Sequence, residues 1–134
     1  MKLSTRGRYG TRLMLQLAAN YGKDEPLPLT EIARREEISV KYLEQLIIPL
    51  KAAGLIESRR GAHGGYVLAK APDEITIGQI LQILEGNISP VPCVKDPSFC
   101  IKYETCNTRK LWETMDKAII QSVCDVTLKD ALSA

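Results

Sequence analysis

The chain has 134 residues, of which 45% are hydrophobic and 25% are charged, which is typical of a globular protein. This length suits one domain, or a small domain with an appended element. No apolar run approaches the ~18 residues of a membrane span, so no membrane association is expected. The chain start lacks the apolar stretch of a signal peptide, and we therefore expect a cytoplasmic protein.

The charge is unevenly distributed along the chain. Residues 1–70 contain 12 Lys and Arg against 7 Asp and Glu, whereas residues 71–134 contain 6 against 9. A basic first half favours contact with a polyanion such as DNA. An uneven but merely solvated surface would show the same imbalance.

Three amphipathic helices are predicted in the first part of the chain. The first runs from about Thr5 to Tyr21, and the second runs from Glu31 to Glu36 with Thr30 as its N-cap. The third follows the N-cap Ser39 and buries its leucines. Pro49 lies inside the third helix and predicts a kink or an earlier end.

Two short strands are expected next, at Leu55–Ser58 and Tyr66–Leu68, around a glycine-rich loop. Three helices and a hairpin in this order predict a mainly α fold, a winged helix-turn-helix with a two-stranded β-wing. The short connection Glu37–Ser39 between the second and third helices agrees with that motif.

The second half of the chain has a predicted helix at Thr76–Glu85, a long helix at Asn107–Val123 and a short one within Thr127–Ala134. Residues 86–105 contain three prolines and form a connection of a length that is usually either functional or disordered. The predicted parts are a DNA-binding domain (1–86), a cysteine loop (87–106) and a C-terminal dimerisation helix with its following segment (107–134).

The predicted DNA contacts gather at the start of the third helix, where recognition helices meet base edges, and at the hairpin tip, which can reach phosphates or the minor groove. An isolated Arg-Arg-Gly would more simply be a solvated turn, but its place after a helix-turn-helix favours DNA. Glu44 either points away from phosphates or accepts from a cytosine amino group. The N-terminal residues either contact phosphates or are solvated. The predicted DNA-binding residues are Lys2, Thr5, Arg6, Arg8, Thr30, Ser39, Val40, Lys41, Tyr42, Glu44, Gln45, Arg59, Arg60, Gly61, His63 and Gly64.

Three of the four cysteines, Cys93, Cys100 and Cys106, lie in one segment. Without an export signal, metal or redox chemistry is favoured over disulfides. The spacing lacks the two-residue interval of a zinc knuckle and favours a thiolate-preferring centre such as an iron–sulfur cluster. Burial as small hydrophobic side chains would explain one cysteine better than three in a polar loop.

Four motifs make the chain resemble a known family: Arg6–Gly10, Tyr42–Leu46, Ala53–Ile56 and Arg60–Tyr66. In this order they resemble the IscR, NsrR and CymR family of bacterial transcription regulators over nearly the whole chain. The cysteine trio is similar to the IscR and NsrR branches, whose members hold a 2Fe-2S or 4Fe-4S cluster. Glu85–Pro90 resembles the CymR branch, which regulates sulfur metabolism. The resemblance implies a homodimer with a cluster on the three cysteines, 2Fe-2S being favoured over 4Fe-4S.

The familiar fourth cluster ligands of these relatives are missing from the sequence. Where IscR-type relatives have a histidine this chain has Arg109, which stays protonated and has no lone pair for a metal. Where some NsrR-type relatives have a carboxylate, it has Arg8. The fourth ligand stays open among Glu104, Asp96, Asp125, Cys124, an external thiol or water. Of these, Cys124 lies about 27 Å from Cys106 at the far end of a long helix, which favours a packing role within one subunit.

A homodimer is also expected from the long helix at 107–123. Its side chains Leu111, Trp112, Met115 and Ile119 form the predicted dimer interface, because the small winged domain offers limited area to cover them. Packing on their own domain is the alternative. A two-fold dimer would place two recognition helices ~34 Å apart on a palindromic operator in double-stranded DNA.

The sequence thus predicts a dimeric repressor of iron–sulfur biogenesis genes, in which cluster occupancy changes the geometry of the two recognition helices. The alternative is a cluster-free repressor of cysteine or sulfur metabolism genes that acts through a protein partner. An enzyme with a small-molecule substrate is not expected. The single histidine, His63, lies in the predicted wing, and no nucleotide-binding glycine motif follows a strand.

Overall fold

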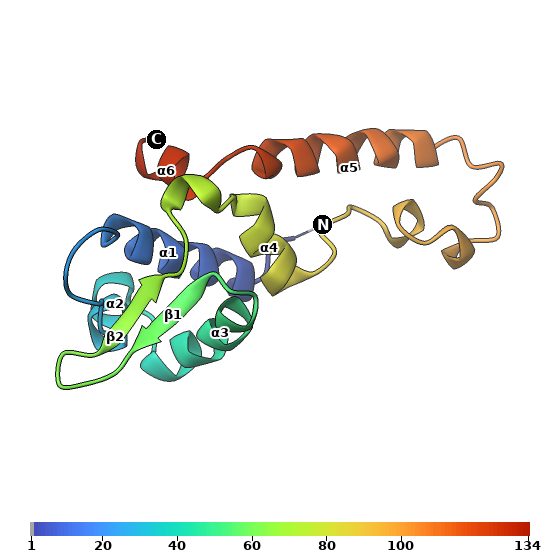
Figure 1. The fold of residues 1–134 in the computed structure, drawn as a ribbon. Helices are drawn as coiled ribbons and strands as arrows, with labels where there is room; N and C mark the ends of the chain where they lie inside the picture. The colour runs from blue at the N-terminus through green and yellow to red at the C-terminus, as the bar shows by residue number, and fades with distance from the viewer. Residues whose placement is uncertain (1) are drawn as a thin grey trace.

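A computed structural model describes residues 2–134 of the chain. Figure 1 shows a helical body with an attached hairpin, and a long helix, α5, that runs along one side of the body and beyond it. The mainly helical fold with a two-stranded sheet confirms the prediction. The helices are α1 Thr5–Ala19, α2 Leu29–Glu36, α3 Val40–Ala52, α4 Ile77–Glu85, α5 Arg109–Cys124 and α6 Leu128–Leu132, the strands are β1 Ile56–Arg59 and β2 Gly65–Leu68, and the 3-10 turns are η1 Pro72–Glu74, η2 Pro92–Val94 and η3 Pro97–Phe99.

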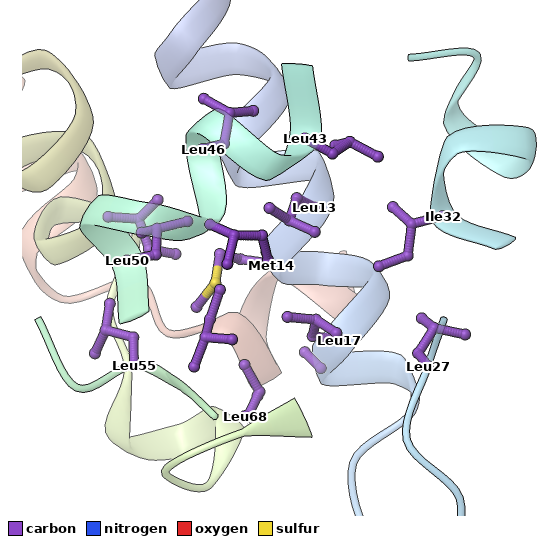
Figure 2. Packing of buried hydrophobic residues seen from close by; sticks show 14 of the residues in the cluster. Leu13, Met14, Leu17, Leu27, Ile32, Leu43, Leu46, Leu50, Leu55 and Leu68 are labelled. Carbon is purple, nitrogen blue, oxygen red and sulfur yellow. The ribbon is translucent and has the colours of Figure 1, made fainter. Parts of the chain in front are cut away.

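The core is aliphatic and is built around α1. This helix turns Leu13, Met14 and Leu17 inward at helical spacing, and all three are essentially unexposed. Burying one such side chain contributes about 1.5–3 kcal/mol. Figure 2 shows how side chains from the other elements surround them. The buried partners include Leu27, Ile32, Leu43, Leu46, Leu50, Leu55, Leu68, Ile80 and Leu128.

Two predicted helix ends in this region were wrong. α1 ends at Ala19, before Tyr21, whose side chain is exposed and lies outside the core. Helix α2 begins at Leu29, because the Pro28 carbonyl already accepts from the N–H groups of Glu31 and Ile32 at 3.1 and 3.3 Å. Thr30 is therefore an exposed residue inside the first turn, and its predicted N-cap role was wrong.

The turn between α2 and α3 has the predicted length. Glu37 closes α2 in the left-handed conformation, with φ of 55°, and Ile38 donates to the Ala33 carbonyl oxygen at 3.2 Å. The predicted N-cap Ser39 is confirmed, because its side chain accepts from the backbone N–H of Tyr42 at 3.1 Å.

Helix α3 continues through Pro49 to Ala52, so the expected earlier end was wrong. Proline has no N–H to give to the Gln45 carbonyl, and Gln45 lies on the exposed side of the helix, where water can replace that donor. Leu50, which is fully buried, holds the last turn against the core.

The hairpin is antiparallel, with Ile56 opposite Leu68. A third strand-like contact, absent from the sequence prediction, joins Leu27 to Tyr66 through two backbone hydrogen bonds of 3.0 and 2.9 Å. A Cβ at Gly65 would collide with the Leu27 carbonyl oxygen. The glycine therefore allows β2 to lie against the segment that precedes α2.

The C-terminal helix α6 returns to the body. Leu128 is fully buried in the core, its N–H donates to Ile75 at 2.9 Å, and Ile77 donates to Val126 at 2.8 Å. The side chains of Thr76 and Thr127 cap α4 and α6. The long helix is thereby fixed at its C-terminal end, while the division of the chain at residues 86 and 106 stays a prediction. None of the helices within residues 2–134 is long and apolar enough to cross a bilayer.

Replacement of Leu46 by alanine should lower the free energy of unfolding by about 2–5 kcal/mol, because it leaves a cavity at an unexposed position in α3. The control is Ile48→Ala in the same helix, where the side chain is 68% exposed and the change should stay within about 0.5 kcal/mol. Urea denaturation measures both. Equal effects for the two variants would contradict this account of the core.

Candidate DNA-binding surface and cysteine segment

The outer face of α3 offers polar side chains to solvent. Lys41, Glu44 and Gln45 are exposed on it, whereas Leu43 and Leu46 on the opposite face are buried. Figure 1 places α3 and the hairpin on the side of the body away from α5. An open helix face next to a hairpin is the arrangement with which winged helices enter a groove of DNA.

Tyr42 has a different position from its exposed neighbours. It is half-buried, its hydroxyl lies 3.1 Å from the Thr5 hydroxyl, and its ring packs edge-on against Tyr9 at a centroid distance of 5.9 Å. These contacts join the start of α3 to the start of α1. Two further residues stabilise the start of α3: Ser39 caps the helix, and Val40 packs against the core.

The basic N-terminal residues are exposed and are partly engaged by the body. Arg6 donates from Nε to the Leu84 carbonyl oxygen at 3.3 Å. The Arg8 guanidinium lies 5.7 Å from the centre of the Tyr9 ring. Lys2 and Thr5 are also exposed. All four lie at or just before the first turns of α1, which carries no acidic residue in its first turn.

The hairpin tip carries the second group of basic side chains. Arg59 is ion-paired with Glu57 at 3.0 Å, while Arg60 takes part in none of the ion pairs found within residues 2–134. Arg60 and His63 are exposed, and Gly61 has φ of 119°, which side chains rarely adopt. Arg60 is therefore the tip cation most available to a phosphate. Gly64 allows the tight turn, since a Cβ there would lie 2.6 Å from the Arg59 carbonyl oxygen.

The cysteine segment, residues 87–106, extends from the body along α5 and contains η2 and η3 (Figure 1). Cys93, Cys100 and Cys106 are free thiols of intermediate exposure. The thiol chemistry fits an iron–sulfur centre. The placement of the three cysteines does not fit such a centre, because no three His, Cys, Asp or Glu side chains in the described part of the chain lie close enough together to hold a metal ion. The predicted ligands are thus present but not assembled in this arrangement.

The neighbours of Cys106 favour the deprotonated form of its thiol. The Thr108 hydroxyl lies 3.1 Å from its Sγ. Hydrogen bonds from that hydroxyl and from the Arg109 backbone N–H, together with the Arg109 charge, lower the pKa of Cys106 below its ordinary value. A thiolate is the form of cysteine that binds metals and reacts as a nucleophile.

Arg109, where the resemblance led us to look for a histidine ligand, lies at the start of α5. Its guanidinium lies 4.0 Å from the centre of the Tyr103 ring and pairs with Glu113 at 2.9 Å. Its Nε is buried without a hydrogen-bond partner in the described structure. The contact with Tyr103 therefore joins the end of the cysteine segment to α5, and the ion pair with Glu113 holds the Arg109 side chain within the helix.

The open candidates for a fourth ligand are also dispersed. Asp96 accepts from the backbone N–H and the hydroxyl of Ser98, at 3.0 and 2.6 Å, and Asp125 accepts from Gln121. Glu104 and Cys124 are exposed. Within residues 2–134 none of them joins the three cysteines in a ligand group.

Asp116 is a structural residue that the sequence analysis did not identify. It is 5% exposed, and it is the one residue of α5 that is fully buried. Its carboxylate accepts from the Ser89 hydroxyl and pairs with Lys95 at 3.3 Å. The start of the cysteine segment is therefore anchored to the middle of α5. Helical spacing alone could not show this, because both partners come from a connecting segment.

The predicted dimer face of α5 is largely open. Leu111 and Met115 are 60% and 41% exposed, and Trp112 and Ile119 are half-buried. The body therefore leaves an apolar side of α5 uncovered, as the sequence analysis expected. Covering such a face is a usual reason for association.

Comparison with known proteins agrees with this architecture. The sequence profile of the Rrf2 family, described as iron-dependent transcriptional regulators, matches residues 3–134. The HTH-type transcriptional regulator CymR of Bacillus subtilis is 44% identical over 133 residues, covering 99% of this chain and 91% of that protein. The solved structure of CymR, described as the global cysteine regulator of B. subtilis, superposes with a TM-score of 0.84 at 43% identity, covering 99% of this chain and 97% of the other. The structure of T. potens IscR superposes with a TM-score of 0.81 at 39% identity, covering 99% and 87%.

Replacement of Asp116 by alanine should release the start of the cysteine segment, because Ser89 and Lys95 lose their shared acceptor. The loss of one buried acceptor should lower the free energy of unfolding by about 1–3 kcal/mol, and amide hydrogen exchange should accelerate in residues 87–95. Asp125→Ala, which removes an exposed carboxylate just after the same helix, is the control. Unchanged exchange in Asp116→Ala would show that the carboxylate does not anchor the segment.

Proposed function

The chain belongs to the Rrf2 family of transcription regulators, and we propose that it binds duplex DNA as a homodimer through α3 and the hairpin tip. The observation that carries the proposal is that an exposed α3 face and the hairpin lie on the side of the body away from α5. At the hairpin tip, exposed Arg60 takes part in none of the ion pairs found within residues 2–134. Lys41, Glu44 and Gln45 would meet base edges in the major groove. The residues at the start of α1 and at the tip would contact phosphates.

The dimer would form along α5. Its exposed leucine and methionine are the largest uncovered apolar side chains of the helix, and a two-fold partner would bury the same face twice. Two recognition helices related by this symmetry would read the two halves of a palindromic operator. Repression would follow where that operator overlaps a promoter.

For the signal, we propose that Cys93, Cys100 and Cys106 hold an iron–sulfur cluster, 2Fe-2S in preference to 4Fe-4S, and that the genes controlled serve iron–sulfur biogenesis. The iron-dependence in the family description and the lowered pKa of Cys106 support this assignment. A cluster would supply a thiolate-bound iron centre sensitive to iron supply and oxidation. The chain's own contribution would be to close residues 93–106 around it, since the ligands are separate in the described arrangement.

A second candidate is a cluster-free repressor of cysteine or sulfur metabolism genes that acts through a protein partner. The 44% identity to CymR favours it. So do the separate cysteines and the Arg109 side chain, which is occupied by Tyr103 and Glu113. Both candidates share the DNA-binding surface and differ only in what the cysteine segment does.

Replacement of Arg60 by alanine should weaken binding to all duplex sequences and reduce the slope of log K against log salt by about 0.9, the value for one lost phosphate contact. Lys129→Ala, which removes one exposed positive charge from α6 on the body, should leave the slope unchanged. Fluorescence anisotropy across a salt series measures both. An unchanged slope for Arg60→Ala would remove it from the phosphate contacts.

Reconstitution with ferrous iron and sulfide under anaerobic conditions should separate the two candidates. A cluster would give absorbance between about 300 and 600 nm from thiolate-to-iron charge transfer. This absorbance should be lost in Cys93→Ala and kept in Cys124→Ala, where the exposed cysteine lies outside the segment. Wild-type protein that stays colourless, with no bound iron or sulfide, would favour the cluster-free candidate.

A further inference from the structure

The first turn of α1 is capped by a residue from α4. Ser4, at the N-cap position, makes no side-chain cap to its own helix. Instead Glu85 Oε1 accepts from the Ser4 N–H at 2.9 Å, the Ser4 hydroxyl at 2.5 Å and the Gly7 N–H at 3.0 Å. One carboxylate oxygen thus does the work of an N-cap, and its negative charge meets the positive end of the helix dipole.

Two glycines of α1 make this contact possible. A Cβ at Gly7 would collide with the Glu85 carboxylate, and a Cβ at Gly10 would collide with the Leu84 side chain. Both glycines are buried within the helix. The end of α4 can therefore reach the backbone of α1 directly, which an ordinary pair of packed helices does not allow.

The same turn of α1 is joined to the recognition helix. Thr5 lies 3.1 Å from the Tyr42 hydroxyl, and Tyr9, one turn later, packs edge-on against the Tyr42 ring. Arg6 adds a further bond from this turn to the Leu84 carbonyl at the end of α4. The start of α1 is thus connected to α4 on one side and to the first turn of α3 on the other.

Glu85 is also the last residue of α4, and only Gly86 separates it from the cysteine segment. Gly86 reverses the chain with φ of 75°, and three residues further on Ser89 is bound to Asp116 of α5. A change in the placement of the segment or of α5 would reach the end of α4 through this short connection. The carboxylate that caps α1 thus belongs to the residue that ends α4, two positions before the cysteine segment begins.

We propose that Glu85 is the positioning residue through which the cysteine segment sets the placement of the recognition helix on DNA, an inference that rests on the proposed DNA-binding function. With the Glu85 cap in place, the first turn of α1 is ordered and Thr5 holds Tyr42. Withdrawal of the carboxylate leaves the N–H groups of Ser4 and Gly7 without their acceptor and loosens the Thr5–Tyr42 contact. The response does not depend on whether the segment holds a cluster or contacts a protein partner.

The test compares Glu85→Ala, Glu85→Gln and Gln82→Ala for binding to a labelled duplex selected from a random pool by the wild-type protein. Alanine removes the cap and should weaken binding roughly five- to tenfold. Glutamine keeps one acceptor oxygen, whose two lone pairs can serve the N–H groups of Ser4 and Gly7, and should bind within about twofold of wild type. Gln82 is exposed on the same helix, and its replacement should have no effect. Circular dichroism confirms at the assay temperature that all variants are folded.

A double-mutant cycle with Tyr42→Phe distinguishes positioning from a general loss of stability. The hydroxyl of Tyr42 and the carboxylate of Glu85 both contact the first turn of α1. The loss of DNA affinity caused by Glu85→Ala should therefore shrink to about twofold or less in the Tyr42→Phe background. Equal losses in both backgrounds, or an Ala variant that binds as wild type does, would overturn the proposal. Wild-type protein that binds no duplex at low salt would overturn the proposed function instead, and amide exchange of residues 4–8 would then still report the cap.

Discussion

The burial of α1 is the constraint on which the rest of the molecule depends. Its inward residues Leu13, Met14 and Leu17 are almost without solvent exposure. The other elements of the body therefore have to pack around this one helix; they are α2, α3, α4, α6 and the hairpin. The glycines of α1 then set how closely α4 can approach. Because the same helix carries the Thr5 and Tyr9 contacts to α3, the placement of the outer face of α3 is a consequence of core packing.

Much of this fold could be predicted from local sequence. The features that were predicted correctly depend on residues close together in the sequence. They are the apolar spacing of α1, the Ser39 cap, and the order of three helices and a hairpin. The errors also have local causes. Tyr21 fitted the apolar spacing of α1, but the helix ends before it. Thr30 is a residue type that often caps helices, but α2 has already begun before it, because the Pro28 carbonyl oxygen accepts the first hydrogen bonds of the helix. Pro49 was expected to kink α3 or to end it early, and the helix does not end early because burial of Leu50 outweighs one missing hydrogen bond.

The site could be predicted in its residue types but not in its connections. Exposed basic residues at a hairpin tip and a cysteine trio are visible in the sequence. Contacts between residues far apart in the chain are not: Glu85 with Ser4, and Asp116 with Ser89 and Lys95, join elements whose approach is decided by tertiary packing. Arg109 illustrates both what the sequence can predict and what it cannot. Its inability to bind a metal follows from its chemistry, whereas its place over Tyr103 required the structure.

The return of α6 to the body affects the order in which the protein can fold during synthesis. The slot filled by Leu128 lies among side chains of the first half of the chain, so a nascent chain that ends before residue 128 leaves that part of the core open to water. The ribosome therefore has to deliver the cysteine segment and α5 before the DNA-binding body can close. Until then the apolar side chains around the Leu128 site stay exposed to water, and premature termination within α5 would yield a chain without a complete core.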